Sequence, residues 1–308
     1  MKWLDGAPIL VPVDFFPCSE SALVQGARLA AAAHASLHVF HVVSPLLPRN
    51  LAERMPGSEE ELKQVALSDS KKALQEAVRR ISCEPSTIIE CDSVLGVTAS
   101  EILRKADAIS ADLVVLGVSG AHGERRRAGD TTRRCLKRAW TNLLIVREGH
   151  DLPLKTVVVG VNFSETSRTA LEHAARIASI SGGKLLVLHA FDAPWHHLHY
   201  RAPTPEASPD FERQFIASMT SRLKEFVDAA LTEYPTLEVH VALMESRNYR
   251  QGIVEFAEVN AADLVVLGAS KTRLSEIVFG STAEKVLSDF PGALLVVRGE
   301  ENHGRKTE

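Results

Sequence analysis

Residues 111–119 read ADLVVLGVS and residues 262–270 read ADLVVLGAS, the same strand-like stretch written twice with one difference. The same separation joins LLIVR (143–147) to LLVVR (294–298), and a slightly shorter one joins ILVPVDFFPCSESAL (9–23) to VVVGVNFSETSRTAL (157–171). The matches keep one order along both halves, as a tandem duplication predicts. The sequence therefore predicts two related domains, residues 1–148 and 154–300, with a short linker between them and a flexible tail at 301–308.

Short apolar runs in the first half predict the strands of one sheet, at residues 9–14, 37–43, 87–91, 112–118 and 142–147. They lack strict alternation, which is typical of strands buried on both faces of a parallel sheet. Helical stripes of alanine and leucine separate them, so we expect an α/β fold with an open, doubly wound sheet in each domain. Segments 44–60 and 191–210, with proline, histidine and polar residues, are expected to be long connections after the second strand.

The composition excludes several classes of protein. The net charge is −4, so no global field favours nucleic acid or an anionic membrane. No apolar run approaches the ~18 residues that span a bilayer, and the N-terminus lacks the apolar centre of a signal peptide. Cys18, Cys83, Cys91 and Cys135 form no CxxC pair and all lie in the first half, which favours reduced thiols. We expect a cytoplasmic protein with no nucleic-acid or membrane partner.

A ligand site is expected at the carboxyl ends of the strands, because open α/β sheets bind ligands where the strand order reverses. The turn after the first strand contributes Asp14 in copy one and Asn162 in copy two. A glycine-bearing loop after the fourth strand enters the last helix at Gly129-Asp130 in copy one and at Gly280-Ser281-Thr282 in copy two. Glycine lets backbone amides approach a ligand closely, and a helix N-terminus attracts phosphate. This edge of each sheet is therefore the predicted binding site.

Together these features resemble the universal stress protein family over nearly the whole chain. Each copy has an opening strand followed by Asp or Asn and then Phe, an Ala-rich helix, a strand with His near its end, the ADLVVLG strand, the glycine loop and a closing LLIVR or LLVVR strand. The resemblance implies two open five-stranded parallel sheets with flanking helices, of the adenine nucleotide alpha hydrolase-like type, with strand order 3-2-1-4-5. Family members commonly pair domains through their last strands, so it also implies an internal pseudo-dimer in which LLIVR faces LLVVR.

The family's ATP-binding members share a loop of the form G-x2-G-x9-G-[S/T], and copy one departs from it. Its spacer has eight residues, and Asp130 stands where Ser or Thr is expected. A carboxylate there is expected to cap its own helix and to repel phosphate. The resemblance gives this degenerate copy the candidate nucleotide-binding residues Asp14, Val42, Gly117, Gly120, Gly129 and Thr131.

Copy two departs from the loop in a complementary way. It keeps the Gly280-Ser281 pair, but Lys271 replaces the second glycine, the spacer again has eight residues, and Asn162 replaces Asp. Lys271 and Arg273 either add charge for a phosphate or are simply solvated. Because copy two keeps the phosphate end of the loop, we expect any nucleotide to bind there. The resemblance implies ATP, with Mg²⁺ if it binds, at Gly160, Val161, Asn162, Ala190, Gly268, Gly280, Ser281 and Thr282.

Histidines offer two further candidates. The run WHHLHY (195–200) contains His196, His197 and His199, which form either a metal site or lid, or an exposed loop. The exposed loop is favoured, because no carboxylate or cysteine stands at metal-ligand spacing. His41 and His189 recur at the end of the second strand of each copy, near the expected site. A ligand contact is one interpretation, and a satisfied, partly buried histidine is the favoured one.

Two local motifs have ordinary explanations beside functional ones. The cluster Arg125–Arg127, continued by basic residues at 133–138, is either a patch for phosphate, RNA or a partner or a solvated face. SGGK (181–184) is similar to a pyrophosphate loop, but it follows a helix rather than the first strand, so we interpret it as a helix C-cap.

Motifs for catalysis are missing: the chain has no GxSxG, no HExxH and no P-loop GxxxxGK[ST]. No catalytic residue and no metal ligand is therefore predicted. We expect a stress-response binding or regulatory protein, with an adenine nucleotide in copy two. Two alternatives stay open. One is a module that binds a protein or another small ligand, since both loops are degenerate. The other is a weak ATPase or autophosphorylating protein. Self-association is compatible with each.

Overall fold

The computed structural model describes residues 3–52, 58–81, 87–118, 129–193, 195, 209–269 and 281–299. The chain divides into two compact units, with the boundary between Pro153 and Leu154. Both glycine loops, at 119–128 and 270–280, and the tail at 301–308 lie outside the described residues.

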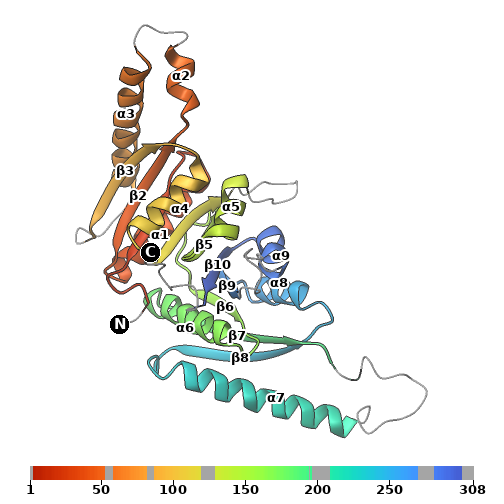
Figure 1. Ribbon diagram of the computed structural model, residues 1–308. Coiled ribbons are helices and arrows are strands. Elements are labelled where there is room, and N and C mark those ends of the chain that lie inside the picture. The colour runs from red at the N-terminus through yellow and green to blue at the C-terminus, as the bar shows by residue number, and fades with distance from the viewer. Residues whose placement is uncertain are drawn as a thin grey trace, which may run out of the picture. The chain divides into compact units, whose positions relative to one another are not determined.

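Unit one alternates strands and helices in the predicted manner (Figure 1). Its strands are parallel and lie in the order β3-β2-β1-β4-β5. The chain winds in one direction from β1 to β3 and then crosses to β4, on the other side of β1. Right-handed crossovers therefore put α1 and α3 on one face of the sheet and α4 and α5 on the other. The elements are β1 (Pro8–Pro12), α1 (Pro17–Ala32), β2 (Ser36–Val43), α2 (Leu46–Ala52), α3 (Glu59–Arg80), β3 (Ile89–Leu95), α4 (Thr98–Ala108), β4 (Leu113–Val118), α5 (Asp130–Arg138) and β5 (Asn142–Arg147).

Unit two repeats this arrangement. Its parallel strands follow the order β8-β7-β6-β9-β10, which is again 3-2-1-4-5 when counted within the unit. The predicted fold class and strand order are confirmed in each unit. The elements are β6 (Thr156–Gly160), α6 (Glu165–Ile180), β7 (Lys184–Phe191), α7 (Pro209–Ala230), β8 (Glu238–Glu245), α8 (Tyr249–Val259), β9 (Leu264–Ala269), α9 (Ser281–Asp289) and β10 (Ala293–Arg298).

The third strand differs from its prediction. The apolar run at 87–91 placed it too early and too short, because β3 continues to Leu95. Asp92 and Ser93 interrupt the apolar run, but an edge strand tolerates polar residues on its open face. Glu90 and Asp92 are exposed, while Ile89 and Cys91 between them are partly buried. The central strands β4 and β9 are buried as expected, except at the glycine near the end of each, which is partly buried in β4 and exposed in β9.

Segment 44–60 is not simply a long connection, as the sequence suggested, because it contains helix α2. Pro48 lies in the first turn of this helix, where its missing N–H is not needed for a helical hydrogen bond. The segment ends with Ser58, which caps α3: its hydroxyl accepts from the Glu61 amide (3.2 Å) and the Glu61 carboxylate accepts from the Ser58 amide (2.8 Å). Most of segment 191–210 lies outside the described residues.

Candidate functional site

The turn after β1 is held by the side chains of Asp14 and Ser19. The Asp14 carboxylate accepts a hydrogen bond from the Phe16 amide (3.2 Å). The Ser19 hydroxyl accepts from the Asp14 amide (3.2 Å) and donates to the Phe16 carbonyl (2.9 Å). Such an Asx turn directs the chain from the end of the strand straight into helix α1.

Unit two builds the same turn with an amide in place of the carboxylate. The Asn162 side-chain oxygen accepts from the amide (3.2 Å) and the hydroxyl (2.6 Å) of Ser164. Ser167 repeats the role of Ser19, accepting from the Asn162 amide (3.3 Å) and donating to the Ser164 carbonyl (2.9 Å). Because only the acceptor oxygen is used, Asp and Asn form the same turn. The two copies therefore differ here in charge and not in backbone structure.

A phenylalanine and a histidine complete the turn in both units. Phe15 and Phe163 both adopt a left-handed backbone conformation, with φ of 66° and 63°. Their rings lie against His41 and His189, with centroids 4.7 and 4.5 Å apart. A positive φ is uncommon for a bulky residue, and these ring contacts accompany it in both copies.

The histidines are satisfied within the fold. Nδ1 of His41 lies 2.6 Å from the Val13 carbonyl, and Nδ1 of His189 lies 2.8 Å from the Val161 carbonyl. A carbonyl can only accept, so Nδ1 carries the proton in both rings. The interpretation of these residues as partly buried, satisfied histidines is confirmed. Each one fixes the end of the second strand to the end of the first.

Packing explains the first glycine of each loop. A Cβ on Gly117 would lie 2.2 Å from the carbonyl oxygen of Cys18, in the first turn of α1. A Cβ on Gly268 would lie 2.8 Å from the carbonyl oxygen of Thr166, at the same place in α6. The helix therefore approaches the end of the fourth strand so closely that a Cβ would force the main chain to shift, which glycine avoids. These two glycines do not by themselves indicate a ligand.

The helix after each loop begins where the sequence predicted. In unit one Gly129 is the N-cap and Asp130 is the first helical residue, followed by the partly buried Thr131. The prediction that the Asp130 carboxylate caps this helix is wrong, because Gly129 occupies the capping position and no side chain caps the helix. The carboxylate instead pairs with Nε of Arg134 (2.8 Å). In unit two α9 begins at Ser281.

The remaining predicted residues lie at the same edge of their sheets. Gly160 ends β6, and the buried Val161 donates its amide to the Leu188 carbonyl (2.9 Å). The other described members are partly buried near the ends of second strands or at the start of α9: Val42, Ala190 and Thr282. Gly120 and Gly280 lie outside the described residues. The topology thus brings the described residues of each copy to the carboxyl edge of its own sheet.

Charge around the turn differs between the units. Burial raises the pKa of the Cys18 thiol, and the negative charges of Asp14 and Glu148 raise it further. The turn of unit one is therefore an acidic environment. The repeat places Thr166, Asn162 and Gly299 at the three corresponding positions of unit two, which remove both carboxylates.

Unit two adds a stack of cationic and aromatic side chains beside its turn. The guanidinium of Arg222 in α7 lies 4.3 Å from the centre of the Phe163 ring. Phe163 meets the edge of Phe226 (5.5 Å), and the guanidinium of Arg168 in α6 lies 4.8 Å from the Phe226 ring. The sequence pattern does not indicate this cluster, because no local spacing links α7 to a turn about sixty positions earlier.

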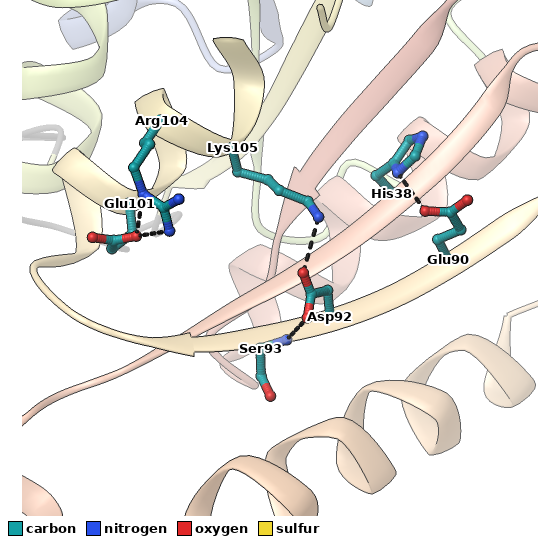
Figure 2. Close-up of polar contacts among 7 residues, drawn as sticks. All are labelled: His38, Glu90, Asp92, Ser93, Glu101, Arg104 and Lys105. Carbon is teal, nitrogen blue, oxygen red and sulfur yellow. Dashed lines mark hydrogen bonds and ion pairs between the residues drawn. The ribbon is translucent and has the colours of Figure 1, made fainter. Parts of the chain in front are cut away.

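A second polar cluster lies at the edge of unit one (Figure 2). Nδ1 of His38 is 3.2 Å from the Glu90 carboxylate, and Lys105 Nζ is 2.9 Å from the Asp92 carboxylate. Burial lowers the pKa of His38 although Glu90 opposes it. Burial acts to raise the pKa of Asp92, but the Lys105 hydrogen bond and charge outweigh it and lower that pKa.

This edge cluster borders a groove of about 630 Å³ between α3, β3 and Lys105. Its charged groups pair with one another (Figure 2), so most of their charge is already balanced within the cluster. Residues in the corresponding positions of unit two are Leu186, His240, Ala242 and Phe256. The cluster is therefore particular to unit one. Across the described ranges no group of three or more His, Cys, Asp or Glu side chains is arranged to hold a metal ion.

The other sequence candidates are partly described. His196, His197 and His199, and the cluster Arg125–Arg127, lie outside the described residues. Trp195 packs edge-on against Phe215 of α7, with centroids 5.6 Å apart. Helix α5 buries Thr132, Cys135 and Leu136 and exposes its basic side chains, as a solvated face predicts: Arg133, Arg134, Lys137 and Arg138.

The SGGK motif ends helix α6, as expected. Gly182 adopts a left-handed conformation (φ 60°), and Gly183 donates its amide to the Ala178 carbonyl (2.9 Å). A Cβ on Gly183 would lie 2.0 Å from the Lys155 carbonyl at the start of β6. The motif therefore lies at the amino edge of the sheet, away from the candidate site.

Comparison with known proteins agrees with the duplicated fold. The Universal stress protein family matches the chain twice, over residues 7–147 and 153–298. The chain belongs to this family. It is therefore a tandem universal stress protein, with one family match in each unit.

Relatives match either the whole chain or one half of it. A universal stress protein of Mycobacterium tuberculosis is 26% identical over 314 residues, covering 94% of both chains. One of Methanocaldococcus jannaschii is 29% identical over 161 residues, covering 50% of this chain and 87% of the relative. The crystal structure of a universal stress protein from Archaeoglobus fulgidus shares the fold, with a TM-score of 0.63 at 17% identity, covering 95% of this chain and 98% of that one. Within the described residues, no helix has the length and apolar character to cross a bilayer.

Proposed function

We propose that this tandem universal stress protein is a cytoplasmic stress-response protein that binds an adenine nucleotide in unit two and is not a dedicated enzyme. The observation that carries the proposal is the difference between the two helix entries. Helix α5 begins with the carboxylate of Asp130, whereas α9 begins with Ser281. A helix N-terminus stabilises a phosphate, and a carboxylate on its first residue opposes that effect.

The turn after the first strand favours the same unit. Asn162 keeps the turn intact without a negative charge, and Gly299 stands in the place of Glu148. A nucleotide brings several negative charges, so unit two presents the smaller electrostatic penalty. Mg²⁺ would accompany ATP as its counter-ion, since nucleotide phosphates supply most of its ligands.

A second candidate function is a module that binds a protein or a non-nucleotide ligand. The packing of Gly117 and Gly268 favours it, because these glycines have a structural explanation that requires no phosphate. Under this hypothesis the degenerate loops are surfaces shaped for another partner. Mass spectrometry of small molecules that co-purify with the chain separates the two: an adenine nucleotide supports the first, and a different compound supports the second.

The direct test is calorimetric titration of the full chain with ATP and Mg²⁺. We expect one site, weakened at least about tenfold by Ser281→Asp, because like charges placed together cost several kcal/mol. Aspartate suits the first turn of a helix, so this substitution should not lower stability. Asp130→Ser, the reciprocal change in unit one, is the matched control and should leave the high-affinity site unchanged. No heat at millimolar ATP would reject the proposal, and radiolabelled ATP tests hydrolysis or autophosphorylation separately.

A further inference from the structure

The stack of Arg222, Phe163, Phe226 and Arg168 places two guanidinium groups beside the turn that follows β6. We propose that Arg168 and Arg222 contact the phosphate groups of the ligand and make unit two selective for a polyphosphate. The proposal rests on the proposed function in taking this strand end as the ligand site. It adds which side chains recognise the ligand and which part of the ligand they recognise.

Geometry keeps both guanidinium groups available to an anion. Arg222 is exposed and, within the described part of the chain, its guanidinium stacks on the ring of Phe163 and does not pair with a carboxylate. Arg168 lies over Phe226 and forms an ion pair through Nε with the exposed Glu165 (3.5 Å), which leaves its other N–H groups for an anion. Stacking on a ring holds a guanidinium by its face and leaves the N–H groups on its edge free to donate. Such a pre-oriented fork matches the oxygens of a phosphate.

The duplicated unit supplies the comparison that points to a ligand. In unit one Glu20 stands in the place of Arg168. Helices α3 and α7 both have 22 residues, so Lys72 stands in the place of Arg222 and Glu76 in the place of Phe226. Lys72 pairs with Asp69 (3.2 Å), and Glu20 pairs with Arg80 (3.4 Å). Unit one therefore forms the same turn without the stack. Formation of the turn in unit two does not explain why the stack is there.

Charge at this edge changes as a set. Unit one carries carboxylates at Asp14, Glu20 and Glu148, whereas the three matching positions of unit two are Asn162, Arg168 and Gly299. The first turn of α6 adds one carboxylate, Glu165, where unit one has Pro17. Packing alone would not require the charge to become less negative at all three positions. An anionic ligand in unit two, excluded from unit one, accounts for them together.

The experiment titrates the full chain with ATP, AMP, adenosine and inorganic tripolyphosphate. We expect affinity to fall in the order ATP, AMP, adenosine, and tripolyphosphate to bind on its own. Arg168→Gln and Arg222→Gln should each weaken ATP and tripolyphosphate about tenfold, the effect of losing one hydrogen bond to a charged group. Adenosine should be unaffected, and Arg222→Lys should restore part of the loss. Lys72→Gln is the matched control in unit one and should change nothing.

The outcomes separate this proposal from the previous one. If ATP binds and both glutamine variants bind it like the original chain, the arginine proposal is wrong and nucleotide binding stands. If tripolyphosphate binds in an arginine-dependent way but ATP, AMP and adenosine do not, nucleotide binding is wrong and the anion site stands. If no probe binds a chain whose circular dichroism and melting are normal, both proposals are overturned.

Discussion

Replacing the glycine at the end of the fourth strand by alanine should destabilise the two units to different and predictable extents. In Gly117→Ala the new Cβ meets main-chain atoms of α1, at 2.2 and 2.4 Å from the Cys18 carbonyl group. No side-chain rotation relieves a clash with backbone, so the helix or the strand must move. In Gly268→Ala the corresponding contact with the Thr166 carbonyl oxygen is 2.8 Å, and in Gly129→Ala nothing lies within 4 Å.

These distances set the expected order of the effects. Reaching an ordinary contact requires a shift of roughly 1 Å for Gly117→Ala and about half of that for Gly268→Ala. Overpacking of this kind costs about 1–3 kcal/mol, and alanine returns about 0.4–1 kcal/mol by restricting the unfolded chain. We therefore expect Gly117→Ala to lower the free energy of unfolding by up to about 2.6 kcal/mol and Gly268→Ala by at most about 1 kcal/mol. For Gly129→Ala the weaker N-cap offsets the entropy gain, which leaves a change near zero.

Differential scanning calorimetry of the full chain measures all three variants. For a unit of this size the loss in Gly117→Ala corresponds to a fall in Tm of about 5–10 °C. The transition that moves should be that of unit one, while Gly268→Ala moves that of unit two. Equal melting of Gly117→Ala and Gly129→Ala would refute the argument that packing requires the glycine. The same result would mean that packing does not explain Gly117, and a ligand would again be a reason for this glycine.

Three further predictions concern titration and pairing. Because burial lowers the pKa of His38, the folded chain binds fewer protons there than the unfolded chain, so stability should fall as pH drops through about 6.5. In His38→Leu, which copies Leu186, the free energy of unfolding measured with urea should depend less on pH between 7 and 5. An unchanged pH dependence would contradict this. Asp14→Asn should lower the pKa of the Cys18 thiol and speed its alkylation at pH 8, whereas Asp69→Asn should not. The predicted pairing of the closing strands should make the outer-edge amides of β5 and β10 exchange hydrogen as slowly as those of central strands, and exchange as fast as in β3 and β8 would reject it.

Sequence patterns predicted the fold well because the signals that specify it are local and occur twice. The ADLVVLG strand and the closing strands have continuous apolar runs, which are typical of strands buried on both faces of a sheet. The third strand was placed wrongly because Asp92 and Ser93 lie at an open edge, where apolar pattern and strand extent no longer coincide. Helix α2 was missed because Pro48 suggests a connection unless the first turn of the helix is already known.

Sequence patterns predicted the edge of the sheet where the candidate site lies, but not the reasons for its residues. Gly117 and Gly268 were chosen as phosphate-loop glycines, whereas each is required by the approach of a helix from the other end of the copy. No sequence pattern indicates Arg222, since its contact with Phe163 depends on how α7 lies on the unit. Spacing along the chain carries no information on either contact, because both are made between elements distant in sequence.

The replacement of Asp14 by Asn162 between the two copies leaves the geometry of the turn unchanged. If the carboxylate were needed to form the turn, its loss would disrupt the turn of unit two and displace the residues around it. The amide oxygen instead makes the same contact with the residue two positions on, at 3.2 Å in both units. Ser19 and Ser167 hold the same amide and carbonyl, and His41 and His189 fix the same strand end. Charge is thus free to vary on a fixed backbone, so forming the turn does not dictate the different charges of the two units, and the anionic ligand proposed for unit two offers a reason for them.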